Sequence, residues 1–91
     1  MQDSQSGCPV VIELGDIRDT KLKLIKLVAR LINKKYSTQK KAASALNIDQ
    51  PKVSQINRAK IEGFSLEYLI NLLVVLGQDV NVKIKHSSET A

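Results

Sequence analysis

Four closely spaced polar side chains, Gln50, Lys52, Ser54 and Gln55, carry hydrogen-bonding groups that suit the edges of DNA bases. A glutamine amide donates and accepts together, which matches adenine, whereas lysine donates to guanine and a hydroxyl serves either base. If residues 50–58 form a helix, these four side chains lie outside the face that its apolar residues define. We therefore predict that these four side chains contact bases.

A second set of polar residues has the chemistry to bind phosphate groups. The start of a helix over residues 39–46 favours anions, because its first amides are free and its dipole is positive there. Lysine, arginine and amide side chains add donors nearby, and such contacts fix the register of a protein on a duplex. The predicted phosphate contacts are Thr38, Gln39, Lys40, Asn57, Arg58 and Lys60.

Two short helices are expected to position these groups. Thr38 is suited to cap a helix over residues 39–46, because its hydroxyl can accept an orphan amide hydrogen of the first turn. Asn47 ends that helix, since asparagine tolerates the left-handed conformation of a sharp turn. Asp49 is predicted to cap the next helix, from Gln50 to about Arg58.

The spacing of apolar residues across these two helices is typical of a helix-turn-helix, in which the helices cross closely at a small residue. Asn47 occupies the ninth position counted from Gln39, at the turn. The apolar positions of the motif fall on Ala43, Ile48, Val53 and Ile56.

Further elements flank this pair. Apolar residues at helical spacing predict a first helix over residues 20–34. Ser65 is expected to cap a nearly all-apolar helix over residues 66–76, which ends at Gly77. Alternating valines predict a strand over residues 79–85. Its partner is either the segment Val10–Ile12 or the same strand of a second chain, because a lone strand leaves its backbone groups unpaired.

The segment from Thr38 to Lys85 resembles the Xre-type helix-turn-helix regulators, the class of Cro and the phage repressors. More narrowly, it is similar to the antitoxin-like branch that includes HigA-type antitoxins. Two positions depart from the usual pattern, in which glycine stands at the turn and between Arg and Lys. Here Asn47 occupies the turn, and Ala59 follows Arg58. The motifs that carry the resemblance are Thr38-Gln39, Asp49-Gln50-Pro51-Lys52-Val53-Ser54, Phe64-Ser65-Leu66 and Leu76-Gly77.

The resemblance implies an all-α, lambda-repressor-like domain of four to five helices with a short C-terminal β-strand. We expect residues 1–15 to be a flexible segment with a short strand, residues 16–78 to bind DNA, and residues 79–91 to be a dimerising strand and tail. The implied function is transcriptional repression through double-stranded operator DNA. Antitoxins of this kind also neutralise a small ribonuclease toxin and regulate their own operon.

A homodimer also follows from geometry, because one short recognition helix reads too few base pairs for selective binding. The surplus apolar surface of residues 66–76 and the C-terminal strand are the expected interface. The residues predicted there are Leu73, Val80, Val82 and Ile84.

Charge is unevenly distributed along the chain. Residues 20–60 carry eleven Lys or Arg and the single acid Asp49, whereas the flanking segments are net acidic. A basic block of this kind favours a polyanionic partner. The alternative is a protein-interaction module that uses the same fold without DNA, but such a module has no need for that charge.

Other classes of function are excluded by what the sequence lacks. With 91 residues the chain is one domain without a cleft between lobes. The single cysteine, Cys8, and the single histidine, His86, exclude an internal disulfide, a multi-cysteine zinc site and paired-histidine metal sites. We expect no enzyme activity, no cofactor and no metal. The sequence has neither a signal peptide nor a membrane span, so we expect a cytoplasmic protein.

Overall fold

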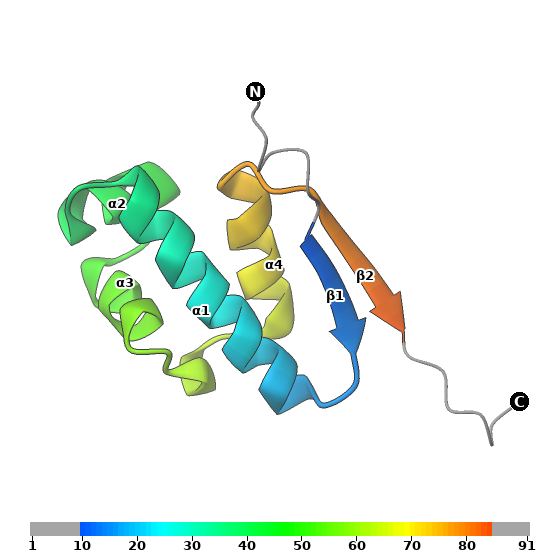
Figure 1. Cartoon of the computed structure of the whole chain (residues 1–91). Helices are drawn as coiled ribbons and strands as arrows, with labels where there is room; N and C mark the ends of the chain where they lie inside the picture. The colour runs from blue at the N-terminus through cyan, green and yellow to red at the C-terminus, as the bar shows by residue number, and fades with distance from the viewer. Residues whose placement is uncertain (1–9, 85–91) are drawn as a thin grey trace, which may run out of the picture.

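A long central helix, α1, is surrounded by shorter helices and a two-stranded sheet (Figure 1). The structure is a computed structural model that describes residues 10–84. Within this range the fold is mostly helical, as expected, with four α-helices and one 3-10 helix. The elements in chain order are β1 (Val10–Leu14), α1 (Ile17–Lys35), α2 (Gln39–Leu46), α3 (Gln50–Asn57), the 3-10 helix η2 (Ile61–Gly63), α4 (Leu66–Val75) and β2 (Val80–Ile84).

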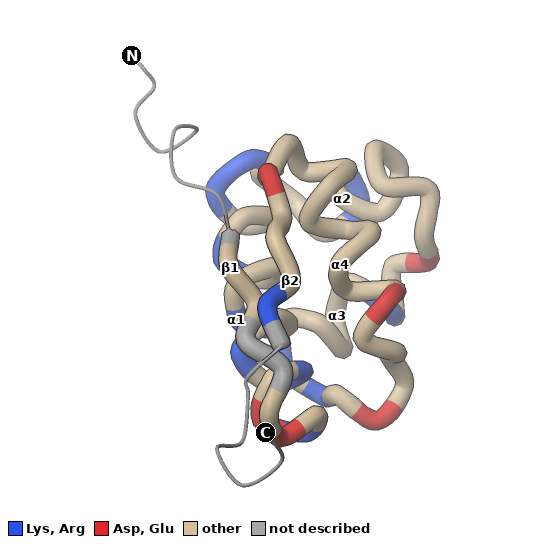
Figure 2. Tube along the Cα trace, turned by 90° about the vertical axis from the view of Figure 1, so that its right-hand side faces the viewer, with Lys and Arg blue, Asp and Glu red and all other residues tan. Residues whose placement is uncertain are grey.

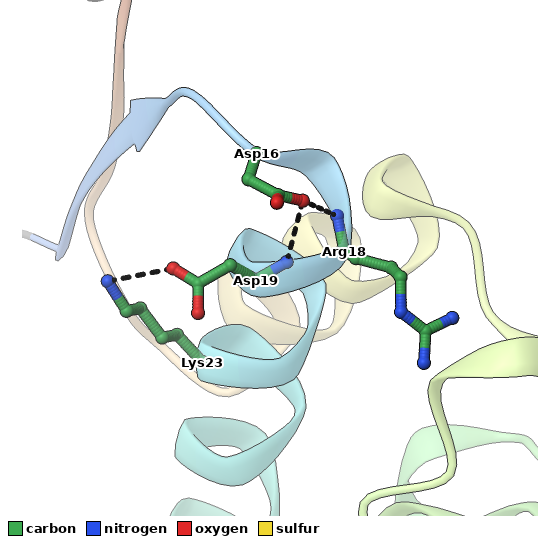
Figure 3. A network of polar contacts seen from close by, with 4 residues as sticks. All are labelled: Asp16, Arg18, Asp19 and Lys23. Atoms are coloured by element: carbon green, nitrogen blue, oxygen red, sulfur yellow. Dashed lines mark hydrogen bonds and ion pairs between the residues drawn. The ribbon is translucent and has the colours of Figure 1, made fainter.

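Helix α1 begins three residues before the predicted start at Thr20. Its cap is Asp16, whose Oδ1 accepts hydrogen bonds from the backbone amides of Arg18 at 2.9 Å and Asp19 at 3.3 Å (Figure 3). The prediction rested on apolar spacing, which becomes regular only after Leu22. The cap, a local polar contact, sets the true start of the helix.

Helix α2 has the bounds that its capping residues predict. Thr38 Oγ1 accepts a hydrogen bond from the amide of Lys41 at 3.1 Å. Asn47 follows the helix with φ of 58° and ψ of 46°, which is the left-handed conformation expected of it. The amide of Ile48 then donates to the carbonyl of Ala43 at 3.0 Å, which closes the turn toward α3.

Helix α3 starts at the predicted residue, but its cap differs from the prediction. Asp49 occupies the capping position, yet its side chain accepts no capping hydrogen bond. Pro51, two residues after Asp49, has no amide hydrogen. The first turn of α3 therefore has one fewer amide that needs a hydrogen-bond acceptor from a capping side chain. The helix ends at Asn57, one residue before the predicted end.

The last helix and the turn after it agree closely with expectation. Ser65 Oγ accepts a hydrogen bond from the amide of Tyr68 at 3.0 Å and so caps α4. The helix ends at Val75, one residue before the predicted end at Leu76. Gly77 follows with φ of 90°, a conformation that glycine adopts without steric cost.

A single apolar core lies where α1 packs against α4 and α3, and α2 packs against α3. Each helix contributes its apolar stripe, and the 3-10 helix and β1 close the edges. The largest fully buried side chains are Ile25, Val28, Ile32, Val53, Ile56, Leu69 and Leu73.

The C-terminal strand, β2, has a partner strand within the same chain. β1 pairs with β2 in parallel, with Val10 opposite Val80 and Ile12 opposite Val82. The connection between them contains all the helices of residues 10–84, and parallel pairing requires such a long connection. Of the two partners that the sequence left open, the structure contains the intrachain one. The end of the predicted strand at Lys85, the tail with His86 and the segment with Cys8 lie outside the described residues.

Candidate nucleic-acid interface

The rotational position of α3 is fixed by two side chains. Val53 and Ile56 are completely buried, and α3 packs against α1 and α2. The small Ala43, 7% exposed, lies on the facing side of α2 and permits close packing of the two helices. Because successive residues of a helix turn by about 100°, burial of Val53 and Ile56 directs Ser54 and Gln55 away from the core.

The outward face of α3 carries three of the four predicted base-contacting residues. Gln50 is exposed, and Ser54 and Gln55 are partly exposed. Pro51 is exposed between them, and Arg58 extends the same face at the end of the helix. This face therefore offers two amides, a hydroxyl and a guanidinium to a groove, which is the set of groups that reads base edges.

Lys52, which was predicted to contact a base, lies beside two aromatic rings. Its Nζ lies 5.4 Å from the ring centre of Phe64 and 5.5 Å from that of Tyr68. An ammonium group near aromatic faces gains a cation–π attraction of about 0.5–1 kcal/mol at a site of this exposure. Lys52 thus lies along the flank of α3 that faces α4, and it must leave the rings to reach a base.

The aromatic pair that holds Lys52 was missed as part of the site. Phe64 and Tyr68 are spaced four apart across the start of α4, and their ring centres are 5.5 Å apart. Burial raises the pKa of the Tyr68 hydroxyl, and the negative charge of Asp49 raises it further. The i, i+4 spacing was the only sequence signal for this pair, because its contact with Lys52 depends on how α4 packs.

The predicted phosphate-contacting residues lie at two places. Thr38, Gln39 and Lys40 are exposed at the start of α2, where Thr38 already caps the helix. Arg58 and Lys60 are exposed after the end of α3. Between them Ala59 has φ of 55°, so this alanine adopts the left-handed conformation that glycine would provide. The departure from the common Arg-Gly-Lys pattern therefore leaves the left-handed turn in place.

Asn57 is joined to α1 through its side chain. Asn33 Nδ2 donates a hydrogen bond to Asn57 Oδ1 at 3.0 Å, which ties the end of α3 to the last part of α1. Because the oxygen of Asn57 is the acceptor, its amide nitrogen keeps its hydrogen atoms for another acceptor such as a phosphate oxygen.

This arrangement agrees with a comparison of the chain with known protein families, in which residues 15–85 match a family described as a helix-turn-helix domain. The chain belongs to this helix-turn-helix family. Membership indicates DNA binding and a role in transcription regulation, since the second helix of such motifs enters the major groove. No curated protein and no solved structure matches the chain significantly.

The positive charge of this helix-turn-helix protein is divided between two regions. Of the eleven cations in residues 20–60, six belong to α1. Figure 2 shows Lys and Arg gathered along the α1 side, and several acidic residues on the side of α3 and α4. The basic block in the sequence is therefore only partly a property of the α2–α3 pair.

Leu73 was predicted at a dimer interface, but the structure excludes it from the surface. It is fully buried between α4 and the rest of the core. Val74 and Val75, which follow it, are 55% and 60% exposed. The strand residues Val80 and Val82 are accessible, and Val82 is 50% exposed. The side chain of Ile84 lies outside the described part.

Two hollows near the start of α1 offer little chemistry. The one of about 310 Å³ lies between β1 and α1, and its two carboxylates are already engaged. Asp16 caps the helix, and Asp19 pairs with Lys23 at 3.2 Å (Figure 3). Among residues 10–84, no group of three or more His, Cys, Asp or Glu side chains could hold a metal ion. In the same range no helix is long and apolar enough to cross a bilayer.

Proposed function

We propose that this chain is a sequence-specific, double-stranded DNA-binding repressor that acts as a homodimer. The observation that carries the proposal is the burial of Val53 and Ile56, which leaves Gln50, Ser54 and Gln55 on the open side of α3. A helix of this length fits the major groove, where the four base pairs differ in donor and acceptor pattern.

In this proposal, base recognition depends chiefly on the two glutamines. Gln50 and Gln55 pair their amides with adenine, and Ser54 contacts either kind of base. Lys52 contacts guanine only after leaving the rings of Phe64 and Tyr68, so its contribution is reduced by the cation–π attraction it gives up.

The phosphate contacts hold the helix in register. We assign them to the start of α2 and to the end of α3, where amides and cations lie at the two sides of the recognition helix. The proposed phosphate-contacting residues are Thr38, Gln39, Lys40, Asn57, Arg58 and Lys60.

A dimer supplies the second half of the recognition surface. Two copies related by a two-fold axis read half-sites about 34 Å apart, or a multiple of that distance. We assign the interface to β2, through Val80, Val82 and Ile84. The exposure of Val82, together with the exposed Val74 and Val75, supports an apolar contact on this side of the molecule.

The resemblance to Xre-type antitoxins extends the proposal to an operon. The chain then represses its own toxin–antitoxin operon in the cytoplasm and binds a small ribonuclease toxin through a surface other than α3. An interaction module without DNA is the competing function, and the exposed Val74 and Val75 favour a protein contact of some kind.

Selection from a pool of randomised duplexes tests the proposal. The full-length protein should enrich a two-fold symmetric sequence, and binding to it should weaken by orders of magnitude between low and moderate salt. Gln50→Ala and Gln55→Ala should each relax the preference at one base pair per half-site, at a cost of about 5- to 150-fold in affinity.

Gln78→Ala is the matched control, because Gln78 follows α4 and lies outside the α3 face. It should leave affinity and preference unchanged. Enrichment of no sequence, or binding that is insensitive to salt, would contradict DNA recognition and favour the interaction module.

A further inference from the structure

The strand β2 carries a pattern of charge that is complementary to itself. Asp79 immediately precedes the strand, Lys83 lies near its end, and both side chains are exposed. Figure 2 shows an acidic residue at the start of β2 and a basic residue farther along it. A second copy of the strand in antiparallel orientation therefore brings opposite charges together, whereas a parallel copy in register would place like charges side by side.

One edge of β2 is open to such a copy. The sheet of residues 10–84 has two strands, and β1 pairs with β2 along its other edge. Backbone amide and carbonyl groups along an open edge form a template for a further strand. In Figure 1, α1 and α4 lie between α3 and β2, so a strand added at this edge leaves α3 uncovered.

The register with β1 shows which side chains of β2 face the helices. Val82 lies opposite Ile12, and residues opposite each other in a sheet point to the same face. Because Ile12 is only 3% exposed, Val82 and Val80 point to the helix side of the sheet. Val82 is nonetheless 50% exposed. An apolar side chain on a further strand would cover it.

The opposite face of the sheet is polar along β2. Asp79, Asn81 and Lys83 alternate with the valines, so they point away from the helices. The two faces of the strand therefore differ in kind. A second copy that keeps its helices on the same side of the sheet must match valine with valine and polar residue with polar residue.

We infer that two copies pair antiparallel along β2 about a two-fold axis at Asn81, with Asp79 of each chain opposite Lys83 of the other. The inference rests on the proposed homodimer and specifies its contact. In this register Val80 lies opposite Val82 on the helix side, and Asn81 lies opposite its own copy on the polar side. Each side chain meets one of the same or complementary kind, as the contact of a surface with itself requires.

Neighbouring registers match the side chains less well. A shift by one residue turns the helices of the second copy to the opposite face of the sheet. An axis at Lys83 places two lysines opposite each other, which is unfavourable. An axis at Val82 places Lys83 opposite Asn81 and Asp79 opposite Lys85. This last register is distinguishable by experiment, because it makes Asp79 depend on Lys85 instead of Lys83.

Reversal of one charge tests the contact. Asp79→Lys places a second lysine opposite Lys83 at two equivalent positions of the dimer, so two attractions become repulsions. The dissociation constant of the dimer, measured by sedimentation equilibrium at low salt, should rise by about 4- to 30-fold. At about 1 M salt, where the screening length is about 3 Å, the rise should be much smaller.

A second substitution should reverse part of this effect. Lys83→Gln in the Asp79→Lys background removes the repulsion, so the dimer should be about 2- to 5-fold tighter than with Asp79→Lys alone. Glutamine is used because Glu13 of β1 lies opposite Lys83, where an added acid would disturb the sheet itself. Lys85→Gln in the same background is the matched control and should leave the dimer as weak as Asp79→Lys does.

Glu62→Lys is the control for the change in net charge. Glu62 is exposed in η2, outside the sheet, and its reversal alters the charge of the chain by the same amount as Asp79→Lys. It should leave the dissociation constant of the dimer unchanged. Far-ultraviolet circular dichroism checks that every variant is folded.

The homodimer and this contact fail in different ways. If the unsubstituted protein sediments as a monomer at every concentration, both are overturned. If it forms a dimer that Asp79→Lys leaves unchanged, the homodimer stands and the contact between Asp79 and Lys83 is overturned. Rescue by Lys85→Gln in place of Lys83→Gln would overturn the axis at Asn81.

Discussion

Asn33 of α1 donates a hydrogen bond to Asn57 of α3, and this bond joins the central helix to the end of the recognition helix. Both residues are polar and lie at the edge of the core, so the bond fixes an orientation more than it adds stability. A net contribution of about 0.5–1.5 kcal/mol is typical of such bonds.

A double-mutant cycle on this pair is the first prediction. Asn33→Ala and Asn57→Ala should each lower the free energy of unfolding, and the double variant should lose about 0.5–1 kcal/mol less than their sum. Urea unfolding measures the three values. Losses that simply add would mean that the two side chains do not interact in solution.

Ala59 supports a second prediction, because its φ of 55° places an alanine in the left-handed region. A residue with a Cβ adopts that conformation at a cost of about 1–2 kcal/mol, which glycine avoids. Glycine also raises the conformational entropy of the unfolded chain, and this offsets part of the gain in stability. Ala59→Gly should therefore raise the free energy of unfolding by about 0.5–1 kcal/mol.

The same substitution at Ala45 is the control. Ala45 is exposed within α2, where glycine should lower stability by about 0.5–1 kcal/mol. Opposite signs for the two substitutions would establish the left-handed conformation of Ala59. A loss of stability at both positions would contradict it.

The elements predicted correctly are those that local contacts determine. Helix α2 has its predicted bounds because Thr38 and Asn47 act within a few residues of themselves. The start of α4 is likewise set by Ser65, and the pattern of Val53 and Ile56 identifies the buried side of α3. These contacts were sufficient to predict that Gln50, Ser54 and Gln55 lie on the outward side of α3.

The features that sequence reasoning missed depend on packing between distant elements. A helix that is apolar on nearly every side has no marked inner face, so the sequence could not distinguish Leu73, which is buried, from Val74 and Val75, which are exposed. The position of Lys52 depends on where α4 places Phe64 and Tyr68. The spacing of residues along the sequence does not indicate how far Lys52 lies from these two rings.

A third prediction concerns pH and the hydroxyl of Tyr68. Burial, and then the charge of Asp49, raise the pKa of this group above its usual value of 10.0 in the folded protein. The folded state therefore holds the proton more tightly than the unfolded state, and stability falls as the pH rises above about 10. Below that pH the contribution is fully present.

Replacing the hydroxyl isolates this effect. Tyr68→Phe should show a shallower loss of unfolding free energy above pH 10 than the unsubstituted protein, and Asp49→Asn should show an intermediate loss. Urea unfolding between pH 8 and about 11 measures it. Identical pH profiles for the unsubstituted protein and Tyr68→Phe would contradict the raised pKa.

The last prediction concerns the proposed homodimer and the open edge of β2. Within residues 10–84 the sheet has only two strands, so β2 has backbone groups that no strand of the described chain pairs. Two copies that pair along β2 would form a four-stranded sheet and cover Val82. Val82→Ser should therefore convert the dimer to monomers, as measured by sedimentation, and weaken duplex binding. Because Val82 is already 50% exposed, the monomer should lose only about 1 kcal/mol or less of stability.

Val11→Ser on β1, where the valine is 58% exposed, is the matched control and should leave the dimer intact. If Val82→Ser sediments as the unsubstituted protein does, the second copy does not bind along β2, and the recognition surface must be doubled through another face or not at all.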